Sequence, residues 1–235
     1  MHGAFTNQVA VITGASSGIG KAIAMALGAG GATLCLLGRN AKALQLAAPR
    51  VTTFTIDLGD GPQIREVAAK LRKDFEGVDI LIHSAGVFVQ DRVDSAAEAD
   101  FDLQHRINTR APSLLTQELL PALRARHGQI VFINSSVARR SPAGVCQYTA
   151  TKTALKAFAD ILRDDVNTAG IRVLSVFPGR TATPMQEAIY RLEGKEYRPE
   201  RLLQPEDIAS VVAHTLCLPR TAEVTEIDIR PMQKP

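Results

Sequence analysis

A tyrosine and a lysine four residues apart are the strongest candidates for acid–base chemistry in this sequence. Tyr148 and Lys152 open a stretch with helical periodicity, and their i,i+4 spacing places both side chains on one helix face. A phenol with a pKa of about 10 is a poor acid–base catalyst at neutral pH, but an adjacent cation stabilises the phenolate and lowers that pKa. A partly buried tyrosine beside a solvated lysine is also common on helices, so the meaning of the pair depends on its neighbours.

A serine upstream of this pair adds a second hydroxyl. Ser135 lies thirteen residues before Tyr148, directly after the apolar run 129–134. A serine beyond the carboxyl end of a strand can donate a hydrogen bond to a substrate oxygen. Together the serine, tyrosine and lysine predict a site that exchanges a proton with a substrate oxygen.

A glycine-rich turn follows the first apolar run of the chain, 8–13, and opens a helical pattern that continues to residue 29. Its candidate binding residues are Gly14, Ser16, Ser17, Gly18, Ile19 and Gly20. Glycines there allow a tight turn and close approach of the backbone to a pyrophosphate, and a helix N-terminus attracts the anion. The spacing is GxxxGxG rather than GxGxxG, so the prediction of a dinucleotide site rests on the strand–turn–helix context. The alternative is a plain connecting turn.

Short apolar runs alternate with helical patterns along the rest of the chain. The strand-like runs are 8–13, 32–37, 51–56, 79–83, 129–134, 171–177 and 225–229. The helical patterns are 20–29, 62–75, 98–126, 147–168 and 205–217. Several of the runs are continuously apolar, which is typical of strands buried on both faces of a sheet. The order predicts an α/β protein with one parallel sheet and helices on both of its faces.

The composition excludes several classes of protein. The chain has 235 residues, 46% of them hydrophobic and 22% charged, with a net charge of +3, no tryptophan and 5% aromatics. No basic block with interleaved aromatics predicts nucleic-acid binding, and no apolar stretch is long enough to predict a membrane span. Three widely separated cysteines, Cys35, Cys146 and Cys217, lack metal-ligand spacing and indicate a reducing compartment. We therefore expect a cytoplasmic protein without a metal.

The chain contains no linker or repeat, so we expect one domain over residues 1–235. The least regular region is 178–205, which carries four prolines around a short helical piece. Long excursions beyond the carboxyl end of a strand commonly cover a substrate in α/β proteins. We expect this region to be a substrate loop.

Six motifs occur in a characteristic order over nearly the whole chain. They are TGASSGIG, HSAG, an asparagine before a long helix, INSS, YTATK and FPGRTATP. In this combination the chain resembles the compact single-domain branch of the short-chain dehydrogenase/reductase family. The resemblance implies a Rossmann-type, doubly wound sheet of about seven strands and NAD(P)-dependent chemistry on carbonyls or secondary alcohols.

The resemblance also implies roles for the candidate catalytic residues. Tyr148 becomes the general acid/base, Lys152 lowers its pKa and holds the nicotinamide ribose, and a serine polarises the carbonyl. A gapless alignment from the glycine before the strand to Tyr148 favours Ser135, with Ser136 as an orienting neighbour; the choice between them stays open. Asn108 belongs to a proton relay through its main-chain carbonyl. Pro112 has no N–H to donate to that carbonyl, which leaves it free to hold a water.

The choice of cofactor depends on the end of the second strand. Relatives that prefer NAD usually carry an aspartate where this chain has Gly38, and the following Arg39 suits a 2′-phosphate. We therefore expect NADP, with NAD less favoured. Ser17 is a departure from this pattern, because many NADP-binding relatives have a basic residue in the glycine turn.

Further cofactor contacts follow from the resemblance, residue by residue. They are Asp57 and Leu58 at the adenine, Ser84, Ala85 and Gly86 after the fourth strand, Pro178, Gly179 and Thr181 at the carboxamide, and Thr183 near the pyrophosphate. His83 replaces an asparagine of the family pattern, and we expect it to be structural. The pair Arg139 and Arg140 has two readings, contact with an acidic substrate or solvated loop residues.

These observations predict an NADP(H)-dependent oxidoreductase that moves a hydride between nicotinamide and a carbonyl or secondary alcohol carbon. The alternative is a non-catalytic NADP-binding sensor or scaffold on the same fold. The expected partner is a small-molecule substrate whose identity the sequence does not disclose. A homodimer or homotetramer, packed through the helices 98–126 and 147–168, is also implied by the resemblance.

Overall fold

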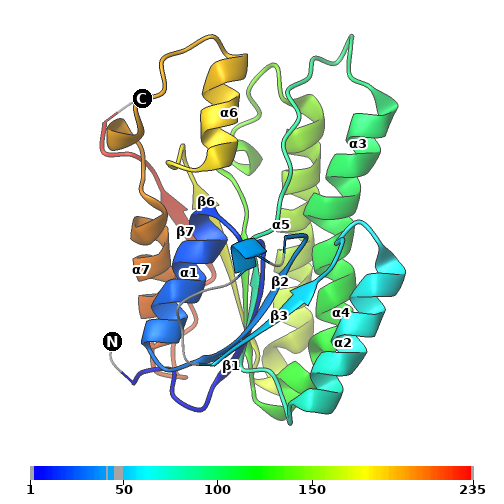
Figure 1. The fold of residues 1–235 in the computed structure, drawn as a ribbon, viewed down its shortest axis with the longest axis vertical. Coiled ribbons are helices and arrows are strands. Elements are labelled where there is room, and N and C mark those ends of the chain that lie inside the picture. Colours follow the sequence, from blue (N-terminus) through cyan, green and yellow to red (C-terminus); the bar gives the residue numbers. More distant parts are fainter. Residues whose placement is uncertain (1–2, 41, 45–49, 234–235) are drawn as a thin grey trace.

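A computed structural model describes residues 3–40, 42–44 and 50–233, and its centre is one parallel sheet (Figure 1). Seven strands pair in the order β3-β2-β1-β4-β5-β6-β7. They are β1 (Val9–Thr13), β2 (Thr33–Gly38), β3 (Val51–Thr55), β4 (Ile80–His83), β5 (Gln129–Ile133), β6 (Arg172–Pro178) and β7 (Glu226–Ile229). The expected doubly wound, seven-stranded α/β fold is confirmed.

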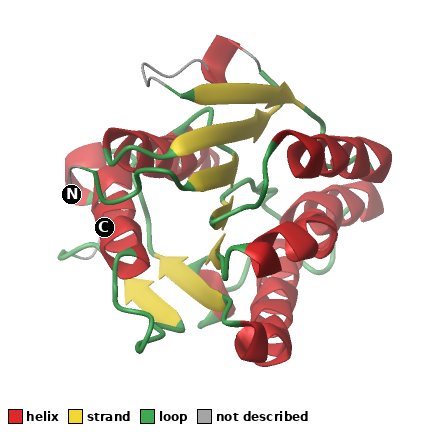
Figure 2. Cartoon of the chain, turned by 90° about the horizontal axis from the view of Figure 1, so that it is seen from below, coloured by secondary structure: helices red, strands yellow, loops and turns green. Residues whose placement is uncertain are grey.

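Helices cover both faces of this sheet, as Figures 1 and 2 show. They are α1 (Gly18–Ala29), α2 (Gly61–Asp74), α3 (Glu98–His105), α4 (Ala111–Ala125), α5 (Cys146–Val166), α6 (Pro184–Leu192) and α7 (Pro205–Leu216). Shorter helical turns are η1 (Lys42–Leu44), η2 (Arg106–Arg110), η3 (Ser136–Ala138), η4 (Asn167–Ala169) and η5 (Pro199–Arg201). The helices α1 and α7 lie on one face, and α2, α4 and α5 on the other.

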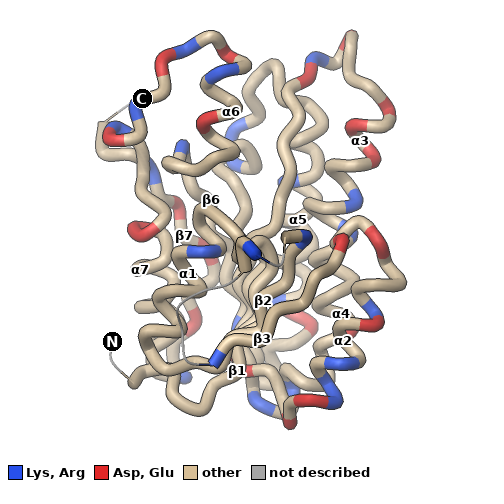
Figure 3. Tube along the Cα trace, viewed as in Figure 1, with Lys and Arg blue, Asp and Glu red and all other residues tan. Residues whose placement is uncertain are grey.

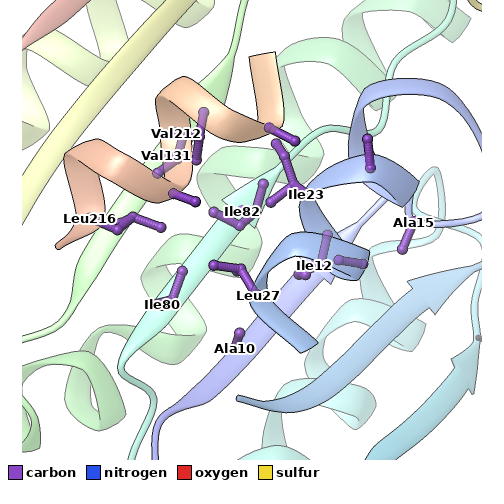
Figure 4. Close-up of a cluster of buried hydrophobic side chains, with 14 of the residues drawn as sticks. Ala10, Ile12, Ala15, Ile23, Leu27, Ile80, Ile82, Val131, Val212 and Leu216 are labelled. Carbon is purple, nitrogen blue, oxygen red and sulfur yellow. The ribbon is translucent and has the colours of Figure 1, made fainter. Parts of the chain in front are cut away.

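The two faces carry separate apolar cores, which explains the continuously apolar strands. Ile12 and Ile82 point to the α1 and α7 side, shown in Figure 4, where they pack near Leu27 and Val212. Their strand neighbours, such as Val11, belong to the opposite core beneath α2, α4 and α5. Because successive side chains of a strand point to opposite faces, a strand buried on both must be apolar at every position.

The segment expected as one helix over 98–126 contains an irregular turn. The α-helices α3 and α4 are joined by η2, a π-helical turn at Arg106–Arg110. The N–H of Ala111 donates to the carbonyl of Arg106, five residues back. Pro112 follows immediately and has no N–H, so the regular i to i−4 ladder cannot be continued through it. The helix therefore accommodates the proline by widening one turn.

The expected substrate loop leaves the sheet at the carboxyl end of β6 and contains α6 (Figure 1). Its two ends are hydrogen-bonded to each other at the base. The N–H of Ala182 donates to the carbonyl of Leu203 at 2.7 Å, and the N–H of Leu203 donates to the carbonyl of Arg180 at 3.1 Å. The loop is therefore closed at its root.

Charged residues of both signs alternate over the outer helices and loops (Figure 3). Among the helices that the structure describes, none combines the length and apolarity that a membrane crossing requires.

Candidate active site

The predicted site residues gather at the carboxyl ends of the parallel strands. The chain proceeds from β1 outward to β3, then returns to place β4 on the other side of β1. In such a sheet a crevice opens where the strand order reverses, and ligands of α/β proteins bind there. The glycine turn follows β1, Ser84 to Gly86 follow β4, and Ser135 follows β5. The described structure therefore brings the predicted cofactor and catalytic residues to one edge of the sheet.

The glycine turn is packed too closely for any side chain. Gly14 has a φ of +70°, and a Cβ there would lie 2.7 Å from the backbone nitrogen of Ala85. Gly18 has a φ of +52°, and a Cβ there would lie 2.9 Å from the Cγ2 atom of Thr183. Both positions need glycine for backbone conformation and for space. The turn thus holds together the segments after β1, β4 and β6.

The N-terminus of α1 points its unpaired N–H groups toward this turn. Ser17 is the N-cap residue, yet its side chain makes no capping hydrogen bond, and the first turn of the helix contains no acidic residue. An uncapped helix N-terminus offers N–H donors and a positive dipole end to an anion. Together with the closely packed glycines, it fits the diphosphate group of a dinucleotide.

Thr13, which the sequence analysis did not select, connects the ends of β1 and β4. Its hydroxyl accepts hydrogen bonds from the N–H groups of Ser84 at 3.1 Å and Ala85 at 3.2 Å, and donates to the carbonyl of Ile82 at 3.3 Å. In the sequence, the position of Thr13 as a polar residue at the end of an apolar run could have indicated this role. Thr13 holds the backbone after β4 beside the glycine turn.

The residues expected at the adenosine end lie after β2 and β3. Arg39 is exposed, and its guanidinium has no ion-pair or hydrogen-bond partner in the part of the chain that the structure describes. Leu58 is buried, while the Asp57 carboxylate is exposed and accepts a hydrogen bond from the N–H of Gly59 at 2.8 Å. A carboxylate-free β2 end beside an unpaired guanidinium fits a phosphate better than a ribose diol.

The candidate acid and its serine are in contact. Tyr148 lies in the first turn of α5 and is 9% exposed. The Ser135 hydroxyl hydrogen-bonds the Tyr148 phenol and also accepts a hydrogen bond from the N–H of Val137 at 3.3 Å. Ser136 begins η3, and no hydrogen bond of its side chain is present among the described residues. The geometry therefore favours Ser135 over Ser136 as the partner of the phenol.

Burial controls the ionisation of this pair of side chains. It raises the pKa of Tyr148 to about 12, and the hydrogen bond from Ser135 acts in the opposite direction. Burial also lowers the pKa of Lys152 to about 8. The Lys152 ammonium lies 5.9 Å from the centre of the Tyr148 ring and donates to the carbonyl of Ile133 at 3.1 Å. The net direction for the phenol is upward, because desolvation of the phenolate outweighs the hydrogen bond from Ser135. The lowering of this pKa by Lys152 stays a prediction.

Asn134 fixes both the serine and the lysine, and the sequence analysis did not single it out. Its side-chain nitrogen donates to the carbonyl of Lys152 at 3.1 Å, and its side-chain oxygen accepts from the N–H of Ser135 at 2.9 Å. It is a buried polar residue at the end of an apolar strand, which was the available signal. Asn134 sets the distance between the ends of β5 and α5.

Asn108 is buried, and its side chain is occupied by structural hydrogen bonds. The amide accepts from the N–H of Val87 at 2.9 Å and donates to the carbonyl of Val87 at 2.9 Å and to the Thr151 hydroxyl at 3.2 Å. The side chain is therefore not available for proton transfer, and Pro112 has no N–H to donate to the main-chain carbonyl of Asn108.

Two other residues have structural partners. His83 is buried, lies 2.8 Å through Nε2 from the Thr116 hydroxyl and stacks on Phe132, and burial lowers its pKa to about 3. The guanidinium of Arg139 covers the ring of Phe177 at 3.8 Å, and it forms ion pairs with two carboxylates on β7. Arg139 is therefore not free to meet an acidic substrate. The described residues contain no cluster of His, Cys, Asp and Glu that could hold a metal ion.

Comparison with known proteins gives consistent matches. The family profile described as short chain dehydrogenase matches residues 8–193. An uncharacterized short-chain type dehydrogenase/reductase of Sinorhizobium fredii is 34% identical over 238 residues, covering 98% of this chain and 94% of its own. An alcohol dehydrogenase of the archaeon Thermococcus sibiricus, solved with 5-hydroxy-NADP, is 27% identical with a TM-score of 0.84, covering 97% of this chain and 98% of its own.

A second solved structure, a metagenomic short-chain oxidoreductase in complex with NADP, is 28% identical. Its TM-score is 0.84, and the match covers 98% of this chain and 100% of that protein. The matched range spans most of the chain and includes the glycine turn and the Tyr148 helix described above. This chain therefore belongs to the short-chain dehydrogenase/reductase family of oxidoreductases.

Proposed function

We propose that this protein is an NADP(H)-dependent oxidoreductase that moves a hydride between nicotinamide and the carbon of a carbonyl or secondary alcohol. The observation that carries the proposal is the convergence of three side chains beside the glycine turn. A buried phenol contacts a serine hydroxyl, and a buried ammonium lies on the same helix face as the phenol. This combination suits proton transfer to an oxygen and has no evident use in a sensor that only binds a nucleotide.

The residues present fit a dinucleotide at the crevice. The glycine turn and the N-terminus of α1, with Thr183, would hold the pyrophosphate. Arg39 would hold a 2′-phosphate, and Asp57 and Leu58 would contact the adenine. The backbone of residues 84–86 would contact the cofactor at the edge of the sheet. Lys152 and Tyr148 would hold the nicotinamide ribose. The remaining contacts, at the carboxamide, would come from Pro178, Gly179 and Thr181. Both solved relatives hold NADP or a derivative of it, which supports NADP for this chain.

Each catalytic residue then has a defined task. NADPH supplies the hydride when it is bound. Tyr148, protonated because burial raises its pKa, donates its proton to the carbonyl oxygen, while Ser135 donates a hydrogen bond to that oxygen. Lys152 holds positive charge near the phenolate that remains. The Asn108 carbonyl would accept a hydrogen bond from a water that returns a proton to the phenolate. In the oxidative direction the Tyr148 phenolate accepts the proton of the alcohol.

The wider setting of the protein is part of the same proposal. We propose a small-molecule carbonyl or alcohol substrate, bound beneath the 178–205 loop, in a single domain over residues 1–235. The three cysteines are free, which suits the reducing cytoplasm. Association as a homodimer or homotetramer through α4 and α5 would cover Ile161 of α5, which is 64% exposed.

The test is a panel of ketones, aldehydes and alcohols with NADPH or NADP consumption as the readout. We expect turnover of at least one carbonyl compound, higher kcat/KM with NADPH than with NADH, and a kcat lower by about 10²-fold or more for Tyr148→Phe. Tight NADPH binding without turnover of any compound would instead support the sensor alternative.

A further inference from the structure

Phe88 lies against the ring of the proposed acid. Its ring centre is 5.1 Å from that of Tyr148, and the planes meet edge-on at 73°. Phe88 is half-buried, while Tyr148 is almost fully buried. Phe88 also follows Gly86 by two residues, so it lies where the segment after β4 leaves the sheet. Phe88 therefore contacts the Tyr148 ring and keeps part of its own side chain exposed.

The backbone on each side of Phe88 is held by a side-chain amide. Asn108 bonds both the N–H and the carbonyl of Val87 at 2.9 Å. Gln104 accepts a hydrogen bond from the N–H of Val89 at 3.2 Å. Gln104 and Asn108 are four residues apart on consecutive helical turns, so both amides face the same extended segment. Phe88 is the residue between the two anchored positions.

Gln104 also connects this segment to the helix that carries Tyr148. It has no exposed surface, and its side-chain nitrogen donates to the side-chain oxygen of Gln147 at 3.4 Å. Gln147 precedes Tyr148, its N–H donates to the Asp91 carboxylate at 3.3 Å, and its side chain donates to the carbonyl of Ala97 at 3.1 Å. The buried Gln104 amide thus bonds both segments, and this fixes their separation.

We infer that Phe88 is a specificity-determining residue that forms an apolar wall for the substituent on the substrate carbonyl, and that Gln104 is the positioning residue that holds this wall beside Tyr148. The inference rests on the proposed function, because a carbonyl oxygen that accepts the Tyr148 proton brings its substituents within reach of Phe88. An aryl or branched alkyl group gains apolar and ring contacts there, whereas a charged group would lose its water without a partner. The substrate class is therefore a ketone or aldehyde with an aryl or branched alkyl substituent.

The first experiment compares acetophenone with acetone for the wild type and Phe88→Ala. The readout is the ratio of the two kcat/KM values in one preparation, which does not depend on the fraction of active protein. We expect the wild type to prefer acetophenone and the ratio to fall by roughly 3- to 10-fold in Phe88→Ala, the range that one ring pair supports. The matched control is Phe101→Ala on α3, where the phenylalanine is 40% exposed, and its ratio should equal that of the wild type.

The second experiment tests the positioning role with Gln104→Leu, which keeps the approximate size of the side chain and removes both of its hydrogen bonds. The acetophenone-to-acetone ratio should fall as in Phe88→Ala, while KM for NADPH stays at the wild-type value. A merely structural role would lower kcat/KM for both ketones equally and leave the ratio unchanged. Should Gln104→Leu not fold, Gln147→Leu removes the same link from its half-buried end.

A binding measurement separates this inference from the proposed function. The chain has no tryptophan, so Phe88→Trp introduces a single indole beside Tyr148. Acetophenone should change its fluorescence saturably, but not that of Phe101→Trp. A saturable change without turnover by the wild type contradicts the proposed function and supports the wall. Turnover with an unchanged ratio in Phe88→Ala overturns the wall, and an unchanged ratio in Gln104→Leu and Gln147→Leu overturns the positioning role. If the wild type shows no turnover and Phe88→Trp shows no saturable fluorescence change, both proposals are overturned.

Discussion

At the scale of single residues, the phenol of Tyr148 is kept protonated by its surroundings. Burial and the ring of Phe88 exclude water from it, and its pKa is raised to about 12. A group that stays protonated up to such a pH is a proton reservoir for carbonyl reduction. For the reverse reaction the phenolate must be stabilised, which places the demand on Ser135 and Lys152.

Tyr148→Phe removes the transferable proton and keeps the ring that packs against Phe88. We expect kcat to fall by about 10²–10⁴-fold, the usual contribution of a general acid or base, with NADPH affinity close to that of the wild type. Steady-state kinetics and an NADPH titration measure the two effects. A kcat equal to that of the wild type would contradict the assignment of Tyr148 as the acid.

The two adjacent serines differ in their contacts. Ser135 hydrogen-bonds the phenol, whereas Ser136 begins the next helical turn. We expect Ser135→Ala to lower kcat by about 10-fold or more, and Ser136→Ala to leave it nearly unchanged, since one lost hydrogen bond to a developing charge costs about 1.5–3 kcal/mol. The reverse order of the two variants in kcat would show that Ser136 is the residue on the substrate oxygen.

We expect the end of β2 to determine the choice between the two cofactors. The Arg39 guanidinium has no partner among the described residues, and its charge-assisted contact with a 2′-phosphate should give about 10–150-fold preference for NADPH. Arg39→Ala should level kcat/KM with the two cofactors. Gly38→Asp should reverse the preference, because a carboxylate repels the phosphate and binds the ribose hydroxyls. A Cβ at Gly38 meets Leu44 at 3.3 Å, which a small rotation of leucine relieves.

The ratio of kcat/KM for NADPH and NADH in the three proteins checks this prediction, at two salt concentrations because an exposed contact is screened. Equal values for the wild type would make Arg39 a surface residue and Ser17 the better indicator.

At the scale of elements, the strands and helices were predictable within one or two residues, whereas the π-helical turn was not. Continuous apolar runs indicate strands buried on both faces, and the structure has all seven of them. Pro112 indicated a local defect but not its form, because a proline inside a helix can be accommodated by a kink or by a widened turn such as η2.

The residues that were missed share one property. Thr13, Asn134 and Gln104 act through hydrogen bonds to the backbone of other elements, and such partners are set by tertiary packing rather than by local spacing. The motif residues were found because their chemistry is carried by their own side chains. The prediction of their catalytic roles stays a prediction.

Pro112→Ala tests whether the absent N–H matters at η2. The new N–H can donate to the Asn108 carbonyl and so compete with a relay water. We expect kcat to fall by several-fold, within the ~10²-fold that a proton-transfer path supports, with unchanged helical content. Steady-state kinetics and circular dichroism give the two readouts, and an unchanged kcat would remove this carbonyl from the mechanism.

At the scale of the whole molecule, the buried ammonium of Lys152 makes stability depend on pH. Its pKa is about 8 in the folded protein against the ordinary lysine value of 10.5, so the unfolded chain binds more protons between these pH values. The free energy of unfolding should therefore rise with pH from about 8 to 10, by up to about 3 kcal/mol. Above pH 10 the raised pKa of Tyr148 acts in the opposite direction.

Lys152→Met should remove this rise and unfold at higher urea concentration at pH 7, although loss of the bond to Ile133 offsets about 1 kcal/mol. Urea unfolding at pH 7, 8, 9 and 10 for both proteins measures it. An identical pH dependence of the two proteins would show that Lys152 is not the group responsible.

The hydrogen bonds that close the base of the 178–205 loop allow the length of this loop to vary. The hydrogen bonds between Ala182, Leu203 and Arg180 hold the two ends of the loop together. The position of the sheet strands therefore does not depend on the length of chain between these ends. Lengthening a loop whose ends are already joined costs little, about 0.6 kcal/mol for each doubling. Insertions or deletions between residues 184 and 200 should therefore change the part of the loop that covers the proposed substrate site. The strands, the glycine turn and the Tyr148 helix should keep their positions. In this respect the sheet and its site residues form a fixed platform, and the 178–205 loop is a part that can vary in length.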